Sequence, residues 1–144
     1  MNSKATTMIE LVVATGVFLI AVTGILYSYL ECLQLQDLGR NISITTAAVK
    51  NKIEEIKNAN FSSIYTTYNN TTFMATGVTG KGVIYVNNSN PDLLVIKVVF
   101  CWKQPNGRVI GEDKNLNGIL DAGEDANGSG QIDSYVQVST QIYG

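Results

Sequence analysis

Histidine is absent from this 144-residue sequence, which also has only two cysteines, two prolines and a formal net charge of −2. Without histidine, the residue most often used as a general base or metal ligand near neutral pH is missing. Arrangements of the Ser-His-Asp or Cys-His type are therefore excluded. The small net charge provides no broad positive field for nucleic acid. The composition favours a structural or binding protein over an enzyme.

The two cysteines, Cys32 and Cys101, do not form a C-x-x-C pair or any zinc-like pattern. Cys32 falls just after a long apolar segment, and Cys101 falls in a strand-like run. A disulfide between them and two unpaired thiols both remain open from the sequence alone.

Charge is also missing from one long stretch, Leu11 to Leu30, which holds twenty uncharged residues rich in Val, Ile, Leu, Ala and Phe. As a helix, a run of this length can cross a hydrocarbon core of about 30 Å. Glu10 stands immediately before it. A carboxylate at the edge of such a segment is costly, so its presence indicates a specific partner.

The N-terminal residues resemble the processing and assembly signal of the type IV pilin family, which includes pilins and the pseudopilins of type II secretion. A short leader, residues 1–5, carries the basic Lys4 and ends in the small residue Ala5. Thr6 follows as the first mature residue, and Glu10 is then the fifth. Ala5 and Thr6 stand where the family most often has Gly and Phe.

This resemblance implies cleavage by a prepilin peptidase between Ala5 and Thr6, followed by N-methylation. It also implies that Glu10 pairs with the positive N-terminus of a neighbouring subunit in a filament. The expected partners are other pilin or pseudopilin subunits, the peptidase and an inner-membrane assembly platform. The expected location is a single pass through the inner membrane with the head outside the cytoplasm, and then a periplasmic or cell-surface filament.

Two simpler interpretations of the apolar segment are a cleaved secretory signal and an ordinary signal anchor. A cleaved secretory signal has an apolar region of about 7–15 residues with a small-residue cleavage site after it, and this run is too long and lacks such a site. An ordinary signal anchor needs only Lys4 before an apolar helix. It gives no reason for Glu10, and the pilin-like interpretation is preferred.

Helical periodicity continues beyond the apolar run. Apolar residues recur at three-, four- and seven-residue steps and define one helix face: Leu35, Leu38, Ile42, Val49, Ile53 and Ile56. We expect four segments: a leader at 1–5, a hydrophobic transmembrane or filament-core helix at 6–30, its amphipathic continuation at 31–58, and a head at 59–144.

The head is expected to be a small antiparallel sheet packed on the amphipathic helix, so the predicted class is α+β. The clearest strand is 93–102, where Leu94 through Trp102 alternate between two faces. Other strands are expected at 83–86, 108–110 and 135–143. Residues 60–79 show no clear period and are predicted to be a surface connection.

A calcium-binding loop is predicted between the last two strands, within residues 112–134. Residues 113–124 fit the twelve-residue pattern D-x-[DN]-x-[DN]-G-x₅-E at every defined position. Ca²⁺ takes six to eight oxygen ligands, and alternate positions of such a loop turn inward to provide them. The predicted ligands are Asp113, Asn115, Asn117, the Ile119 carbonyl, Asp121 and Glu124.

The pattern restarts at Asp125 and reaches Asp133, but its twelfth position is Val136 and brings no closing carboxylate. Asp125 and Asp133 are therefore predicted as auxiliary ligands of the first ion, and a weak second site is the alternative. Residues 111–134 hold six acidic residues and one basic residue. Without a cation, such a loop would repel itself, which argues against a plain polar loop.

The sequence thus predicts a non-catalytic filament subunit, a minor pilin or pseudopilin with a calcium-stabilised head. The alternative is a membrane-anchored, calcium-dependent adhesin or binding module that never polymerises. It shares the head and the loop, but would keep residues 1–5 and tolerate the loss of Glu10.

Overall fold

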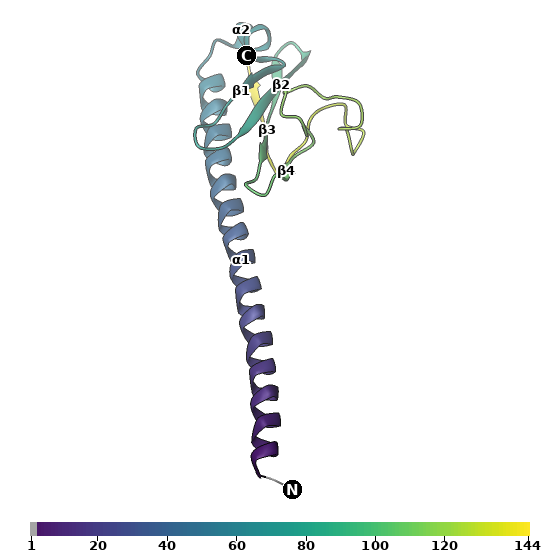
Figure 1. Ribbon diagram of the computed structural model, residues 1–144. Helices are drawn as coiled ribbons and strands as arrows, with labels where there is room; N and C mark the ends of the chain where they lie inside the picture. Colours follow the sequence, from purple (N-terminus) through teal and green to yellow (C-terminus); the bar gives the residue numbers. More distant parts are fainter. Residues whose placement is uncertain (1–2) are drawn as a thin grey trace. The chain divides into compact units, whose positions relative to one another are not determined.

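A computed structural model describes residues 3–144, with side chains described from Thr7 onward. Two helices and five strands follow one another along the chain (Figure 1). The elements are α1 (Ser3–Lys57), α2 (Phe61–Tyr68), β1 (Thr71–Phe73), β2 (Gly80–Asn90), β3 (Leu93–Lys103), β4 (Val109–Ile110) and β5 (Val136–Tyr143). The predicted α+β class is confirmed.

Two compact units divide the chain, Met1–Asp37 and Leu38–Gly144, so the boundary falls inside α1. The described part of the first unit is helix alone, and it is long and apolar enough to cross a membrane. Its apolar side chains are exposed in every direction. The Thr15 and Thr23 hydroxyls donate to backbone carbonyls of the preceding turn, so they do not require water.

The second unit contains an antiparallel sheet in the order β1-β2-β3-β4, with β5 also paired to β3. One edge of β3 is paired with β2, and β5 and β4 pair in succession along its other edge. The β2–β3 register places Val83 opposite Val99 and Ile84 opposite Val98. β3 is therefore the central strand of the head.

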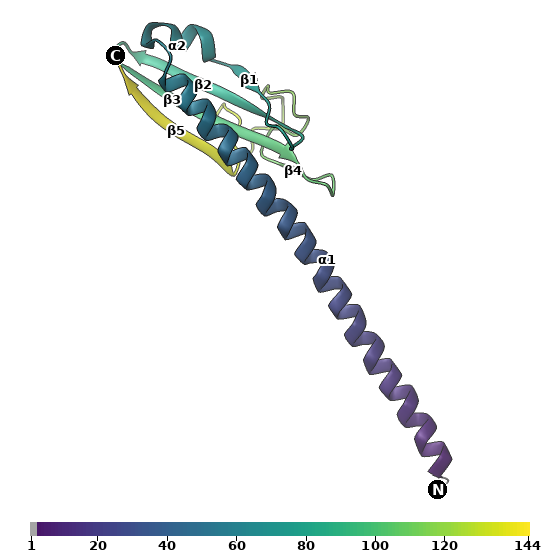
Figure 2. The same ribbon diagram turned by 90° about the vertical axis from the view of Figure 1, so that its left-hand side faces the viewer.

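The main core lies between one face of the sheet and residues 38–57 of α1 (Figure 2). Val49, Ile53 and Ile56 face the sheet from the helix. The strand residues opposite them form one of the two alternating faces of β3: Leu94, Ile96, Val98, Phe100 and Trp102. Val136 and Ile142 extend the same layer from β5.

A second, smaller core covers the opposite face of the sheet. Val83 and Val99 pack there with Cys101 and with Ile132 from the loop between β4 and β5. Leu116 and Leu120 of the same loop are partly buried against this cluster. The sheet is therefore covered by a helix on one face and by an irregular loop on the other (Figure 1).

The segment 60–79 differs from its prediction as an unstructured connection, because it holds α2 and β1. Asn60 caps α2 by accepting a hydrogen bond from the Ser62 backbone N–H at 3.1 Å. Ile64 is fully buried, and Phe61 and Tyr68 pack beside it at helical spacing. Only one residue of α2 is fully buried. Among the many Asn, Thr and Ser residues of this segment, so short an apolar face gives no clear helical period.

Replacing Ile96 should show how much the main core contributes to stability. Ile96 is fully buried, whereas its neighbour Val95 is 36% exposed on the other face. Ile96→Ala should lower the free energy of unfolding by about 2–5 kcal/mol, and Val95→Ala by less than about 1 kcal/mol. Denaturant unfolding in detergent, followed by the fluorescence of the buried Trp102, measures both. Equal losses would contradict this assignment of faces.

Candidate functional site

The loop between β4 and β5 contains neither helix nor strand over residues 111–135. Strands β4 and β5 flank it, as the sequence had predicted, so the loop does not belong to a helix–loop–helix unit. The Glu112 backbone N–H donates to the Asp133 carbonyl at 2.9 Å and joins the two ends. Gly111, with φ +110°, lies so close to β3 that an added Cβ would be 2.3 Å from Cys101 Sγ.

The first turn of the loop is organised by two acidic side chains at its ends. The Asp113 carboxylate accepts from the backbone N–H groups of Asn117 at 3.1 Å and Gly118 at 2.8 Å. The Glu124 carboxylate accepts from the Lys114 N–H at 2.8 Å and the Asp121 N–H at 3.1 Å. The side chains at positions 1 and 12 of the predicted calcium loop, Asp113 and Glu124, are thus hydrogen-bonded to the backbone of the same loop.

Gly118 makes the sharp bend at position 6, with φ +82°. An added Cβ would lie 2.5 Å from Thr72 Cγ2 of β1. The glycine is thus required both by its own conformation and by the close approach of the sheet.

The middle ligand positions face the Asp121 carboxylate. The Nδ2 groups of Asn115 and Asn117 both donate to Asp121 Oδ2 at 2.7 Å. The Asn117 Oδ1 accepts from the Ile119 N–H at 2.6 Å, which holds the backbone of Ile119 near the same turn. The predicted side-chain ligands therefore lie within one turn of the loop.

Burial distinguishes the two end carboxylates from ordinary surface acids. Asp113 is fully buried and Glu124 is 6% exposed. Among the residues with described side chains, neither forms an ion pair with Lys or Arg. Burying a carboxylate without a compensating positive charge is costly. The backbone N–H donors offset only part of that cost.

A second turn repeats the geometry of the first, twelve residues later. The Asp125 carboxylate accepts from the Ser129 and Gly130 N–H groups, each at 3.0 Å, as Asp113 does from Asn117 and Gly118. The Asn127 Nδ2 and Ser129 Oγ both donate to Asp133 Oδ2 at 2.8 Å, as two asparagines do to Asp121. The structure thus places Asp125 and Asp133 in a turn of their own.

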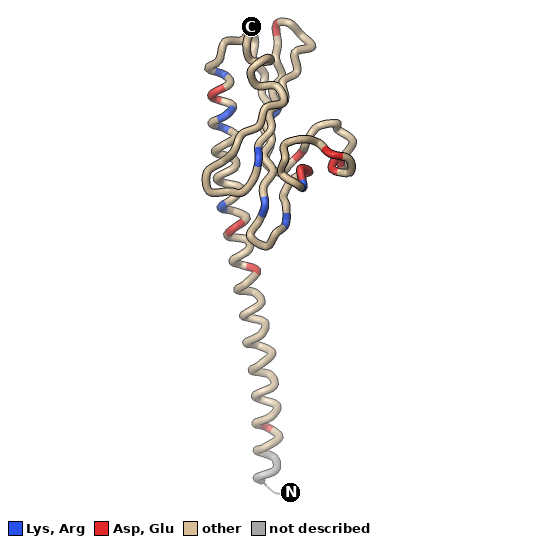
Figure 3. Tube along the Cα trace, turned by 45° about the horizontal axis from the view of Figure 1, so that its top comes forward, with Lys and Arg blue, Asp and Glu red and all other residues tan. Residues whose placement is uncertain are grey.

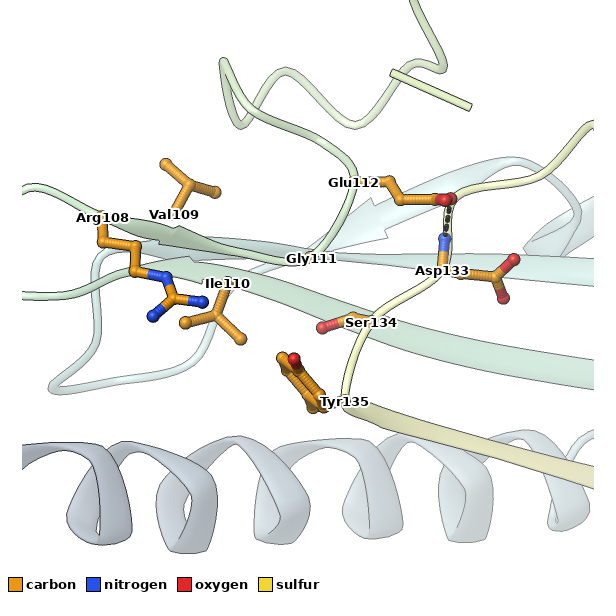
Figure 4. Close-up of a pocket in the computed structure, with 8 residues that line it drawn as sticks. All are labelled: Arg108, Val109, Ile110, Gly111, Glu112, Asp133, Ser134 and Tyr135. Carbon is orange, nitrogen blue, oxygen red and sulfur yellow. Dashed lines mark hydrogen bonds between the residues drawn. The ribbon is translucent and has the colours of Figure 1, made fainter. Parts of the chain in front are cut away.

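Glu112 supplies the carboxylate that the twelfth position of this second turn, Val136, lacks. Its carboxylate accepts from the Ala126 N–H at 3.1 Å and the Asp133 N–H at 2.9 Å, the latter drawn in Figure 4. These are positions 2 and 9 of the second turn, the same positions that Glu124 binds in the first. Glu112 was not among the predicted ligands. The available signal was its place twelve residues before Glu124.

Lys97 of β3 ties the second turn to the sheet through an ion pair with Asp133. Burial favours a higher pKa for Asp133, but hydrogen bonds from Asn127, Lys97 and Ser129 outweigh it and lower the pKa to about 2. On the same face, the Tyr85 hydroxyl accepts from the Ile132 N–H at 3.1 Å. Burial raises the pKa of Tyr85, so this phenol stays neutral.

Each cysteine is a free thiol within its own unit, Cys32 exposed and Cys101 buried. Burial raises the pKa of the Cys101 thiol to about 11, so it is protonated at neutral pH.

Among the described side chains, from Thr7 onward, no three His, Cys, Asp or Glu residues lie close enough together to hold a metal ion. Any cation in the loop would also need amide and backbone oxygens. The donor types present, carboxylate, amide and carbonyl, are those that suit Ca²⁺. Figure 3 shows the concentration of acidic residues in this loop.

The predicted assembly residue Glu10 lies exposed on α1. Among the described side chains it forms no ion pair. The predicted cleavage point between Ala5 and Thr6 lies where the structure describes the backbone only, and Met1 and Asn2 of the leader lie outside the described residues.

Comparison with protein-family models, with curated proteins and with solved structures found no match to this chain.

The pH dependence of stability should report on Asp133. Its pKa is about 2 in the folded protein and about 3.9 in an unfolded chain. The ionised form therefore stabilises the fold above about pH 4, and this contribution is lost as the pH falls toward 2. In chelator, the stability difference between wild type and Asp133→Asn, measured by denaturant unfolding, should shrink over this range.

The exposed Asp92 provides a matched control, since Asp92→Asn makes the same chemical change outside the loop. Its stability difference from wild type should stay nearly constant over the same pH range. Parallel pH profiles for wild type and Asp133→Asn would contradict the assignment.

Proposed function

We propose that this protein is a non-catalytic filament subunit of the type IV pilin-like class, a minor pilin or pseudopilin. The observation that carries the proposal is the part of α1 at residues 7–37, whose apolar side chains are exposed on all sides and which carries an exposed Glu10 near its N-terminal end. A helix that is apolar all round requires lipid or other apolar helices around it. In a membrane, lipid would surround this helix. In a filament core, the apolar helices of other subunits would surround it.

Glu10 gives this helix a reason to assemble rather than only to anchor. A carboxylate in an apolar environment is stabilised by a cationic partner. The predicted cut before Thr6 would create a positively charged N-terminus four residues from Glu10 in sequence. In a bundle of processed subunits, the N-terminus of one chain would neutralise Glu10 of the next and set their register.

Calcium is the proposed ligand of the head, bound in the loop between β4 and β5. Support comes from the buried Asp113 and Glu124, which have no described cationic partner. A bound ion would supply that charge and would replace the asparagine amide donors that now face Asp121. The second turn, with Glu112, Asp125 and Asp133, offers the same kinds of donor for a second ion.

The N-terminus of the native protein tests the filament proposal. Mass spectrometry of N-terminal peptides, from membranes and from sheared surface filaments or an enriched secretion filament, should find a methylated peptide starting at Thr6. The filament fraction should be enriched in it. An intact terminus at Met1 or Asn2, confined to membranes, would contradict the proposal and favour the membrane-anchored binding module.

Glu10→Ala should keep the processed terminus and a folded head but be depleted from filaments, because the neighbouring N-terminus loses its counter-charge. Glu31→Ala provides the matched control, since Glu31 is an exposed carboxylate on the same helix. It should be incorporated normally. Equal filament levels for both variants would remove the proposed role of Glu10.

Calcium binding is tested by calorimetry on the full chain in detergent. We expect a dissociation constant of about 10⁻⁴ M, in the range of extracellular sites with few charged ligands. Glu124→Gln should weaken binding by at least about tenfold because the closing carboxylate is lost. Asp92→Asn, outside the loop, should bind as wild type does. The absence of any heat with millimolar calcium would overturn this part of the proposal.

A further inference from the structure

The outer face of the sheet is apolar and depends on the loop for its cover. Val83 of β2 and Val99 of β3 are at most 2% exposed, and Cys101 of β3 is 1% exposed. Their partners outside the sheet are Ile132, Leu116 and Leu120, all from the loop between β4 and β5. If this loop moved away, a continuous apolar patch on two neighbouring strands would meet water.

Few contacts other than these hold the loop on the sheet. Lys81 Nζ donates to the Asn117 carbonyl at 3.2 Å. Lys97 pairs with Asp133, and the Tyr85 hydroxyl accepts from Ile132. The Cys101 thiol also donates a weak hydrogen bond to the Asp133 carbonyl, at 4.0 Å. These anchors are side chains of the outer face of β2 and β3, and they bind both turns of the loop.

The internal order of the loop comes from its acidic side chains. Glu112, Asp113, Glu124 and Asp125 each accept hydrogen bonds from two backbone N–H groups of the loop. The same carboxylates also repel one another, because residues 111–134 carry six acidic side chains and only one basic one. A cation relieves that repulsion, and its removal restores it.

We propose that the loop is a calcium-held cover for the outer face of the sheet, which opens without calcium and exposes Cys101, Val83 and Val99 while the main core stays folded. The inference rests on the calcium binding proposed above. The two layers are separable because the main core between α1 and the inner face contains none of the loop residues that cover the outer face. Calcium therefore controls whether the head presents a polar or an apolar outer surface.

Thiol labelling of the full chain in detergent tests this cover. Iodoacetamide is added at one fixed pH in calcium or in chelator, and the modification of each cysteine is followed by peptide mass spectrometry. Cys101 should react at least about tenfold faster in chelator, because a locally opened segment no longer protects the thiol. The exposed Cys32 is an internal reference, and its rate should not change.

Two further readouts separate cover opening from general unfolding. The fluorescence of the buried Trp102 should keep its native spectrum in chelator, because this residue belongs to the main core. Glu124→Gln should label rapidly at calcium concentrations that protect wild type, and Asp92→Asn should be protected as wild type is. A Trp102 spectrum that becomes that of unfolded protein in chelator would overturn the local cover.

Calorimetry on the same sample tells the two proposals apart. Heat of calcium binding with an unchanged Cys101 labelling rate would overturn the cover and leave calcium binding intact. No heat, with equal labelling in calcium and chelator, would overturn both.

Discussion

The burial of β3 on both faces is the constraint on which the head depends. Its even-numbered residues from Leu94 to Trp102 face α1, while Val99 and Cys101 face the loop. Hydrogen bonds to β2 on one side and to β5 and β4 on the other satisfy its backbone. Uncovering either face would present apolar surface to water, which costs free energy.

The two covers meet this need by different physical means. The helical cover, residues 38–57 of α1, satisfies its own backbone and only has to present an apolar stripe. The loop cover has no ladder of backbone hydrogen bonds, and its N–H groups are bound by carboxylates such as Asp113 and Glu112. The stability of the outer face is therefore linked to the charge state of the loop.

This linkage makes the acidic side chains of the loop part of the fold. Asp113 is fully buried, so a change in its charge affects the packing of the loop. Ion pairing of Asp133 with Lys97 provides one anchor that does not need a cation. The first unit, in contrast, leaves its apolar side chains and Glu10 exposed.

The sequence by itself determined the features that depend on local spacing. Alternation separated the two faces of β3, and the helical period found the buried stripe of α1. The spacing of Asp, Asn and Gly from Asp113 to Glu124 indicated a turn in the loop, whereas its predicted calcium ligation stays a prediction. Only the tertiary structure decided the rest. It showed α2 to be a helix with a single fully buried residue, Ile64, and it brought Glu112 across to the second turn. Local patterns cannot report such contacts, because they exist only once the sheet has brought the two ends of the loop together.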